Sequence, residues 1–364
     1  MIPFGRAADL LRASIAARAF PAAAVQVGSR EAVLWEEAFG TLTYDRDAPD
    51  ATTDTIFDLA SLTKIICTGT LAMRALDDGL LRLDDRVAEW IIGWRGADRR
   101  EVTVGDLLAH SAGLTAYLPY FRDLTGRVEF QHAIAETPLE YEPRTRAVYS
   151  DLGFMLLGFI LEDARARAAT GWAGATDPAS LLQAQFRRVA SNLTLEPLTF
   201  NLSRAWRPRT APTEQDPWRG RTLVGEVHDE NTWALGGAAG HAGLFGTAAA
   251  VGSFARAALH TINGAHILAK PETMRTFTTR TDVPGSSRAL GWDTMLPTSS
   301  CGTRMSASAI GHTGFTGTSV WIDWERDLYV VMLTNRVHPS RDNDAIRQIR
   351  PRFHDAVVAE IASS

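Results

Sequence analysis

The segment Ser61-Leu62-Thr63-Lys64 places a hydroxyl and an amine three residues apart. If a helix begins near Ser61, residues at this spacing share one face, with side chains within about 6 Å of each other. The amine of Lys64 then lies beside the hydroxyl of Ser61, and the helix N-terminus favours negative charge there. Such a pair can activate a serine nucleophile without a histidine. The alternative is an ordinary surface lysine, because so short a motif also arises by chance.

Two further motifs carry polar groups at the ends of expected elements. Tyr149-Ser150-Asp151 precedes an apolar stretch with helical spacing, which places Tyr149 at a junction between a loop and a helix. Asp151 is a candidate cap for that helix, and Tyr149 is a candidate core residue. His312-Thr313-Gly314 lies between two strand candidates, where Gly314 permits another backbone to approach closely. Each motif alone is compatible with a structural role.

Strand candidates occur near both ends of the chain. Residues 22–28 and 32–39 are apolar runs separated by a short polar turn, which predicts an antiparallel hairpin. Four more candidates follow one another near the other end, at residues 291–296, 307–312, 318–324 and 328–335. A helical period then runs through residues 340–362.

The middle of the chain is mostly helical. The expected helices cover residues 61–78, 103–109, 151–166, 179–190 and 247–261. The stretch 168–232, rich in proline and tryptophan, is expected to contain long ordered loops. This order predicts an α+β fold, with one antiparallel sheet from both chain ends, flanked by helices and interrupted by a mostly helical inserted lobe. The expected lobes are residues 1–60 with 286–364, and residues 61–285, with a cleft between them.

The composition is that of an ordinary globular protein. The chain has 364 residues, 45% hydrophobic and 22% charged, which excludes disordered and fibrous classes. The net charge is −5 and the arginines are scattered among acidic residues, so nucleic acid is not an expected partner. Of the 37 basic residues, only Lys64 and Lys270 are lysines. A GC-rich genome accounts for the arginines, but it does not explain why Lys64 is a lysine.

The sequence also bears on location and partners. No segment approaches the roughly 20 uninterrupted apolar residues of a membrane span. Asp9, Arg12 and Arg18 interrupt the apolar stretch that a secretory signal needs, which predicts a surface helix and, unless a leader was removed, a cytoplasmic location. Cys67 and Cys301 are expected to be buried free thiols. We expect no cofactor and a small-molecule or short-peptide substrate, and the oligomeric state is left open.

A second group of polar residues lies between residues 225 and 241. It contains His228, Asp229 and His241, whose side-chain types are those of metal ligands. The run lacks a zinc-ligand spacing, so we expect hydrogen bonds that fix a loop at the rim of the cleft, and no metal. His110, which follows an expected helix, is likewise expected to fix a loop.

Together the three motifs resemble those of the serine β-lactamase-like hydrolases. This group includes class C β-lactamases, D-alanyl-D-alanine carboxypeptidases, D-aminopeptidases and several esterases. The resemblance covers most of the chain and extends to the flanking segments Ile56 to Ala60, Val102 to Leu114 and Gly311 to Gly317. It implies the β-lactamase/transpeptidase-like fold and a serine hydrolase that forms an acyl-enzyme from amides or esters.

The resemblance also implies a role for each matching residue. Ser61 is the implied nucleophile, and Tyr149, partnered by Lys64, is the implied base that takes the serine proton. A neighbouring cation is expected to favour the phenolate of Tyr149. The implied oxyanion hole consists of the backbone N–H groups of Ser61 and Phe315. The implied substrate-binding residues are Asp151, His312, Thr313 and Gly314.

Two departures from the family pattern bear on the substrate. His312 stands where β-lactamases of this group have lysine, so we expect no permanent cation for a β-lactam carboxylate, and a charge on His312 only when it is protonated. Asp151 stands where asparagine is commoner, and its carboxylate should keep Lys64 protonated and repel anionic groups. We therefore expect neutral esters or amides, or substrates with a free amine, in preference to penicillins, and among these D-amino-acid-containing peptides or amides, or small esters. The alternatives are a weak class C-like β-lactamase and a catalytically silent ligand-binding member.

Overall fold

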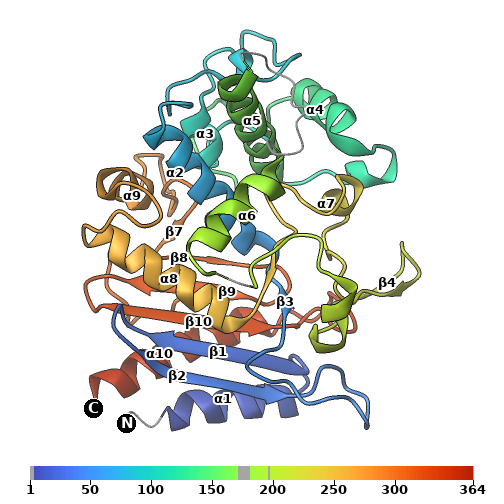
Figure 1. The fold of residues 1–364 in the computed structure, drawn as a ribbon, viewed down its shortest axis with the longest axis vertical. Helices are drawn as coiled ribbons and strands as arrows, with labels where there is room; N and C mark the ends of the chain where they lie inside the picture. The colour runs from blue at the N-terminus through green and yellow to red at the C-terminus, as the bar shows by residue number, and fades with distance from the viewer. Residues whose placement is uncertain (1–3, 171–180, 196, 364) are drawn as a thin grey trace.

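A six-stranded antiparallel sheet forms the centre of the molecule (Figure 1). The computed structural model describes residues 4–170, 181–195 and 197–363. The strand order is β2-β1-β10-β9-β8-β7, so the N-terminal hairpin pairs directly with the C-terminal strands. The strands are β1 (Ala22–Gly28), β2 (Val33–Gly40), β7 (Asp293–Thr294), β8 (Ile310–Thr313), β9 (Ser319–Asp323) and β10 (Leu328–Thr334). The predicted sheet from both chain ends is confirmed.

The strand β7 is much shorter than the six residues predicted for it. Only Asp293 and Thr294 pair with β8. Gly291 adopts a positive φ of 84°, and its N–H donates to the carbonyl of Leu108 at 2.8 Å. The chain therefore leaves the sheet edge and contacts the helical region, which an alternation pattern does not reveal.

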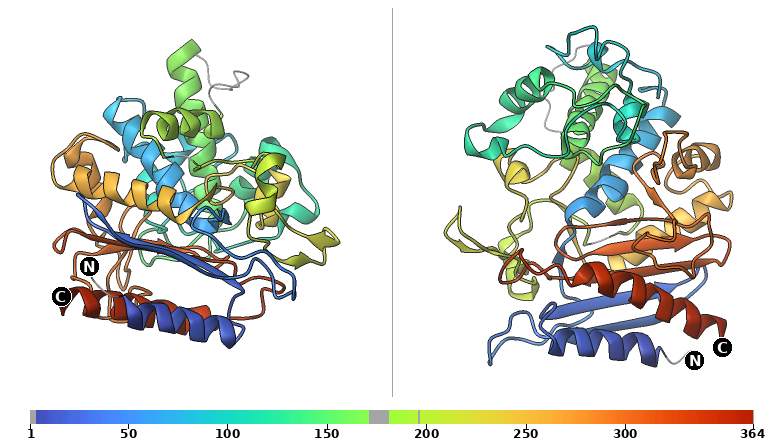
Figure 2. Two further views of the ribbon diagram at one scale, coloured as in Figure 1. Left: turned by 60° about the horizontal axis from the view of Figure 1, so that its bottom comes forward. Right: turned by 180° about the vertical axis from the view of Figure 1, so that it is seen from behind.

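The central strands of the sheet are buried on both faces. Helices α1 (Gly5–Ala16) and α10 (Ile346–Ala362) cover one face, and α8 (Ala248–Ile262) covers the other (Figure 2). All seven residues of β1 are buried, as expected for a strand packed on both sides. Gly252 lets α8 lie so close to β1 that a Cβ at this position would overlap Gln26.

The remaining helices are α2 (Thr70–Asp77), α3 (Val104–Leu108), α4 (Gly126–Glu136), α5 (Asp151–Thr170), α6 (Leu182–Asn192), α7 (Glu230–Ala234) and α9 (Pro271–Thr278). Among these, α5 packs against α2, α3, α4 and α6, and most of its described side chains are buried. The sequence did not predict α4, α7 or α9. The predicted helix at residues 61–78 is instead a 3₁₀ turn (Ala60–Leu62), a π-helical segment (Lys64–Gly69) and α2.

Several predictions are only partly covered by these observations. Residues 171–180 and 196, within the predicted long loops, lie outside the described residues. The proposed division into two lobes stays a prediction, since α8, from the expected helical lobe, packs on the sheet. Within the described ranges, no helix is both long and apolar enough to cross a membrane.

Two short strand pairs complete the described secondary structure. The pair β3 (Phe57–Asp58) and β6 (Phe245–Gly246) lies directly before Ser61. The pair β4 (Gln215–Asp216) and β5 (Arg221–Thr222) forms a hairpin at one side of the molecule (Figure 1). The first pair fixes the chain where it enters the turn that carries Ser61.

Candidate active site

A cleft of about 630 Å³ brings the predicted site residues together. Its walls come from the turn at Ser61, the start of α5, the strand β8 with the loop after it, and loops near residues 228–242 and 336–350. The predicted residues that line it are Ser61, Tyr149, Asp151, His312, Thr313, Gly314 and Phe315. Lys64 lies beneath its surface, with no exposed side-chain area.

The turn before Ser61 has an unusual backbone. Ala60 has a φ of 47°, which is costly for a residue with a Cβ, and such strain of about 1–3 kcal/mol is typical of functional sites. The carboxylate of Asp58 accepts the N–H of Ala60 at 2.8 Å and holds this conformation. The side chains of Ser61 and Lys64 meet as predicted, with Nζ 3.0 Å from Oγ.

The ammonium group of Lys64 has three acceptors for its three N–H bonds. They are Oγ of Ser61 at 3.0 Å, Oδ1 of Asp151 at 2.7 Å and the carbonyl oxygen of His241 at 3.1 Å. Burial alone would lower the pKa of Lys64, but the charge of Asp151 and the neighbouring Tyr149 outweigh it and raise that pKa above its ordinary value. Lys64 is therefore a cation that donates to Ser61.

The sequence indicates Asp151 as a candidate cap of α5, but the structure places another residue in that role. The hydroxyl of Ser150 accepts the N–H of Gly153 at 3.4 Å, which is the contact of a capping residue. Asp151 is the first residue of the helix, and its carboxylate turns toward Lys64. The expected ion pair between Asp151 and Lys64 is present in the structure.

Tyr149 lies over the ammonium group, with its ring centroid 4.7 Å from Nζ of Lys64. Its hydroxyl is buried and has no hydrogen-bond partner in the part of the chain that the structure describes. Burial raises the pKa of Tyr149 above 10, and the charge of Lys64 lowers it by less. The resting side chain is thus a neutral phenol: the charge of Lys64 favours the phenolate as expected, but burial outweighs it.

His110 fixes the segment that carries Tyr149. Its Nδ1 accepts the N–H of Ser150 at 3.0 Å, and its carbonyl accepts the N–H of Val148 at 2.9 Å. Its ring packs between Tyr149 and Phe154, with centroid distances of 4.6 and 4.9 Å. The predicted loop-fixing role of His110 is confirmed by these contacts.

His312 is buried and neutral. Its Nδ1 lies 2.8 Å from the carbonyl of Thr313, which places the ring proton on Nδ1. Burial, together with the charges of Arg288 and Lys64, lowers the pKa of His312 well below 6.5. His312 therefore supplies no positive charge near neutral pH, in keeping with the expectation that it is charged only when protonated.

The loop after β8 packs against the turn that carries Ser61. A Cβ on Gly314 would lie 2.5 Å from the carbonyl oxygen of Leu59, so the predicted close backbone approach is confirmed. Phe315 follows, half-exposed in the cleft, and its N–H donates no hydrogen bond within the described residues. The segment that contains the second implied oxyanion donor thus lies against the turn that contains the first.

The second polar group fixes loops around the cleft. His228 pairs with Glu214 through Nε2 at 2.9 Å, and His241 pairs with Asp229 at 2.8 Å. The contact of His241 with Asp229 fixes this loop, in which the carbonyl oxygen of His241 accepts a hydrogen bond from the ammonium group of Lys64. Among the described residues, no three His, Cys, Asp or Glu side chains are grouped as metal ligands.

The cleft contains permanent cations that the sequence did not indicate. Arg288 lies with its guanidinium carbon 5.0 Å from the ring centroid of Tyr149, and it has no ion-pair partner among the described side chains. Other arginines that line the cleft are Arg336, Arg341, Arg347 and Arg350. These arginines place permanent charge in the cleft, and the expected lack of a permanent cation for a β-lactam carboxylate stays a prediction. In a chain so rich in arginine, no local motif distinguishes Arg288 from the others.

Comparison with known proteins identifies the family. The family described as Beta-lactamase matches residues 7–351, and the chain belongs to that family. A protein of Escherichia coli strain K12, named "Putative D-alanyl-D-alanine carboxypeptidase", is 32% identical over 313 residues, which cover 79% of this chain and 70% of the relative. The resemblance inferred from the three motifs is confirmed at the level of the family.

Solved structures show the same fold. The hydrolase EstCE1, described as having promiscuous acyltransferase activity, superimposes with a TM-score of 0.75 at 21% identity, over 97% of both chains. A class C beta lactamase superimposes with a TM-score of 0.72 at 16% identity, over 96% of both chains. The fold is the α+β β-lactamase/transpeptidase fold, as predicted.

We expect Lys64→Arg to reduce acylation of Ser61 by at least about a hundredfold, the usual scale of lost proton-transfer catalysis. A guanidinium is larger than the fully buried ammonium and does not give up its proton. The matched control is Lys270→Arg, since Lys270 is exposed and its ammonium group donates to the carbonyl of Asp77 at 3.5 Å, away from the cleft. Labelling rate with a fluorophosphonate, together with a melting curve, measures both. Equal labelling rates for the two variants would contradict this role of Lys64.

Replacement of Asp151 should change the pH dependence of acylation. The Asp151 charge raises the pKa of both Lys64 and Tyr149. In Asp151→Asn both pKa values fall, so the pair of Lys64 and Tyr149 loses its first proton at a lower pH. Because kcat/KM rises with pH as this proton is lost, we expect that rise to occur about one to three pH units lower. Asp293→Asn, at the cleft wall, is the control and should leave the profile in place. An unmoved or upward-shifted profile for Asp151→Asn would refute this assignment.

Proposed function

We propose that the protein is a serine hydrolase that forms an acyl-enzyme from amide or ester carbonyls, with Ser61 as the nucleophile. The observation that carries the proposal is the contact between the buried ammonium of Lys64 and the hydroxyl of Ser61, at 3.0 Å, at the floor of a cleft. A buried charge is costly unless it is paired. A cation held at this place stabilises the alkoxide that develops on Ser61.

The proton of Ser61 goes to the pair formed by Tyr149 and Lys64. Both groups are protonated at rest, so the reactive form is the one in which the pair has lost one proton. With the phenolate of Tyr149 as acceptor, Oγ of Ser61 bonds to the carbonyl carbon, and the carbonyl electrons move to its oxygen. The N–H groups of Ser61 and Phe315 receive that oxygen. The electrons then return to re-form the carbonyl, the bond from the carbonyl carbon to the leaving nitrogen or oxygen breaks, and Tyr149 gives that atom its proton. Water attacks the acyl-enzyme in the same way, and Ser61 is the leaving group of that second step.

The substrates we propose are peptides or amides that contain D-amino acids and end in a carboxylate. Arg288 supports this class, because a guanidinium without an acidic partner in the described chain can bind a carboxylate in two hydrogen bonds. Asp151 does not oppose it, since its charge is engaged by Lys64. The name of the Escherichia coli relative supports the same class. Small neutral esters and β-lactams are the competing substrates.

Covalent labelling tests the proposed reaction. We expect a fluorophosphonate to add one label to the protein and Ser61→Ala to accept none, because the buried ammonium of Lys64 contacts the hydroxyl of Ser61 in the cleft and stabilises its alkoxide. Intact-mass spectrometry measures the adduct. If the wild-type protein stays unlabelled although its melting curve shows that it is folded, the result would support a catalytically silent ligand-binding protein instead.

Substitution of Arg288 tests the proposed substrate class. Arg288→Gln should lower kcat/KM for an acylated D-alanyl-D-alanine peptide by about tenfold to a hundredfold, the value of a charged hydrogen bond. The same peptide as its C-terminal amide should be little affected. Because His312 stays neutral well below pH 6.5, the preference for the acid should not grow between pH 8 and 5.5. Equal losses for acid and amide would reject a role of Arg288 in recognition.

A further inference from the structure

Asp58, three residues before Ser61, connects three segments around the implied oxyanion hole. One carboxylate oxygen accepts the N–H of Ala60 at 2.8 Å, and the other accepts the N–H of His228 at 2.7 Å. Its backbone carbonyl accepts the hydroxyl of Thr316 at 2.7 Å. Asp58 is 2% exposed, so these contacts are shielded from water. It therefore ties the turn of Ser61 to the loop of Phe315.

His228 supports Phe315 from the other side. The rings of His228 and Phe315 stack at a centroid distance of 5.6 Å and an interplanar angle of 25°. The guanidinium carbon of Arg336 lies 4.4 Å from the centroid of the Phe315 ring, and its Nε donates to the Phe315 carbonyl at 2.7 Å. These contacts hold both the side chain and the backbone of Phe315.

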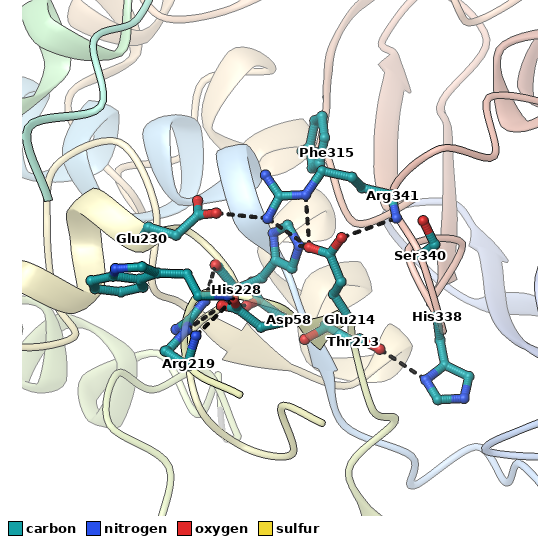
Figure 3. A network of polar contacts seen from close by, with 12 residues as sticks. Asp58, Thr213, Glu214, Arg219, His228, Glu230, Phe315, His338, Ser340 and Arg341 are labelled. Atoms are coloured by element: carbon teal, nitrogen blue, oxygen red, sulfur yellow. Dashed lines mark hydrogen bonds and ion pairs between the residues drawn. The ribbon is translucent and has the colours of Figure 1, made fainter. Parts of the chain in front are cut away.

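An ionic network fixes the ring of His228 (Figure 3). Its Nε2 lies 2.9 Å from Glu214, whose carboxylate accepts Nε of Arg341 at 2.7 Å. Arg341 also pairs with Glu230 at 2.7 Å. Because Glu214 is shared by His228 and Arg341, the ring cannot turn without breaking a buried charged contact. Neither the family motifs nor the proposed reaction assigns a role to this network.

We propose that Asp58 and His228 are positioning residues that set the separation between the two N–H donors of the oxyanion hole. This inference rests on the proposed function, since it concerns the same site. Ser61 and Phe315 are 254 positions apart in the sequence, and their segments approach closely where Gly314 lies against the Leu59 carbonyl. Asp58 accepts hydrogen bonds from Ala60 in the first segment, from Thr316 in the second and from His228. The ring of His228 stacks on Phe315.

Catalysis depends on how the two N–H donors are aligned with the oxyanion in the transition state. A donor stabilises the developing oxyanion only at a distance of about 2.7–3.1 Å, and loss of one donor costs about 10²–10³ in kcat. Asp58→Asn keeps the shape of the side chain but turns one acceptor into an NH₂ group that faces an N–H. The segment held by that acceptor moves, and its N–H donor loses alignment. We expect kcat to fall by about tenfold to a hundredfold, with KM changed by less than about threefold.

The test measures catalysis and transition-state mimicry in the same variants. Wild type, Asp58→Asn, His228→Ala and His228→Phe are titrated with a fluorophosphonate, and kcat is expressed per labelled site. Affinity for phenylboronic acid is measured in parallel, because the tetrahedral adduct places an oxygen in the oxyanion hole. We expect kcat and boronate affinity to fall together in Asp58→Asn and His228→Ala. His228→Phe, which keeps the ring stack on Phe315, should recover most of the loss.

The control is Asp163→Asn, which removes another buried carboxylate far from the cleft. Asp163 is 5% exposed and pairs with Arg127 at 2.6 Å, so its loss destabilises the fold without moving the oxyanion donors. It should lower the melting temperature and leave kcat per labelled site unchanged.

Three outcomes would overturn the proposal. One is a kcat per labelled site within twofold of wild type in both Asp58→Asn and His228→Ala. The second is a fall in kcat with unchanged boronate affinity. The third, an unlabelled wild-type protein, would refute the proposed function as well, so the two failures are distinguishable.

Discussion

The burial of a single ammonium group constrains this region of the molecule more than any other contact. Removing an unpaired ammonium from water costs several kcal/mol, so the fold must supply acceptors around Lys64. Those acceptors come from the Ser61 turn, the first residue of α5 and the loop at His241. That loop is itself held by the pair of His241 with Asp229. The same contacts thus satisfy the charge and assemble the cleft.

This constraint explains why lysine persists at one position of a chain that otherwise uses arginine. A guanidinium spreads its charge over five N–H groups in a plane, whereas the pocket around Lys64 offers three acceptors and two aromatic faces. Lys270, the other lysine, is exposed and meets no such requirement. The composition therefore carries a structural signal at one lysine and none at the other.

Much of the site could be predicted from the sequence because its motifs are local. The spacing of Ser61 and Lys64 was enough to place their side chains together, although the backbone there is 3₁₀ and π-helical. The elements with strong periodicity, such as β1, β10 and α8, were also found. The ion pair of Asp151 with Lys64 was expected once the motifs were matched to the family, but the raised pKa of Tyr149 depends on burial by chain segments far apart, which periodicity does not encode. Arg288 escaped notice for the same reason.

The central pairing of β1 with β10 has a consequence for synthesis of the protein. One edge of β1 pairs with β2, and on the other edge residues 23–28 pair with residues 329–334. The middle of the sheet therefore closes only after residues 329–334 have been synthesised. Until then the apolar strand β1 has one unpaired edge, and the segment of Phe315 has not met that of Ser61. A growing chain therefore exposes an aggregation-prone edge until the last strands dock, and the cleft around Ser61 is incomplete until then.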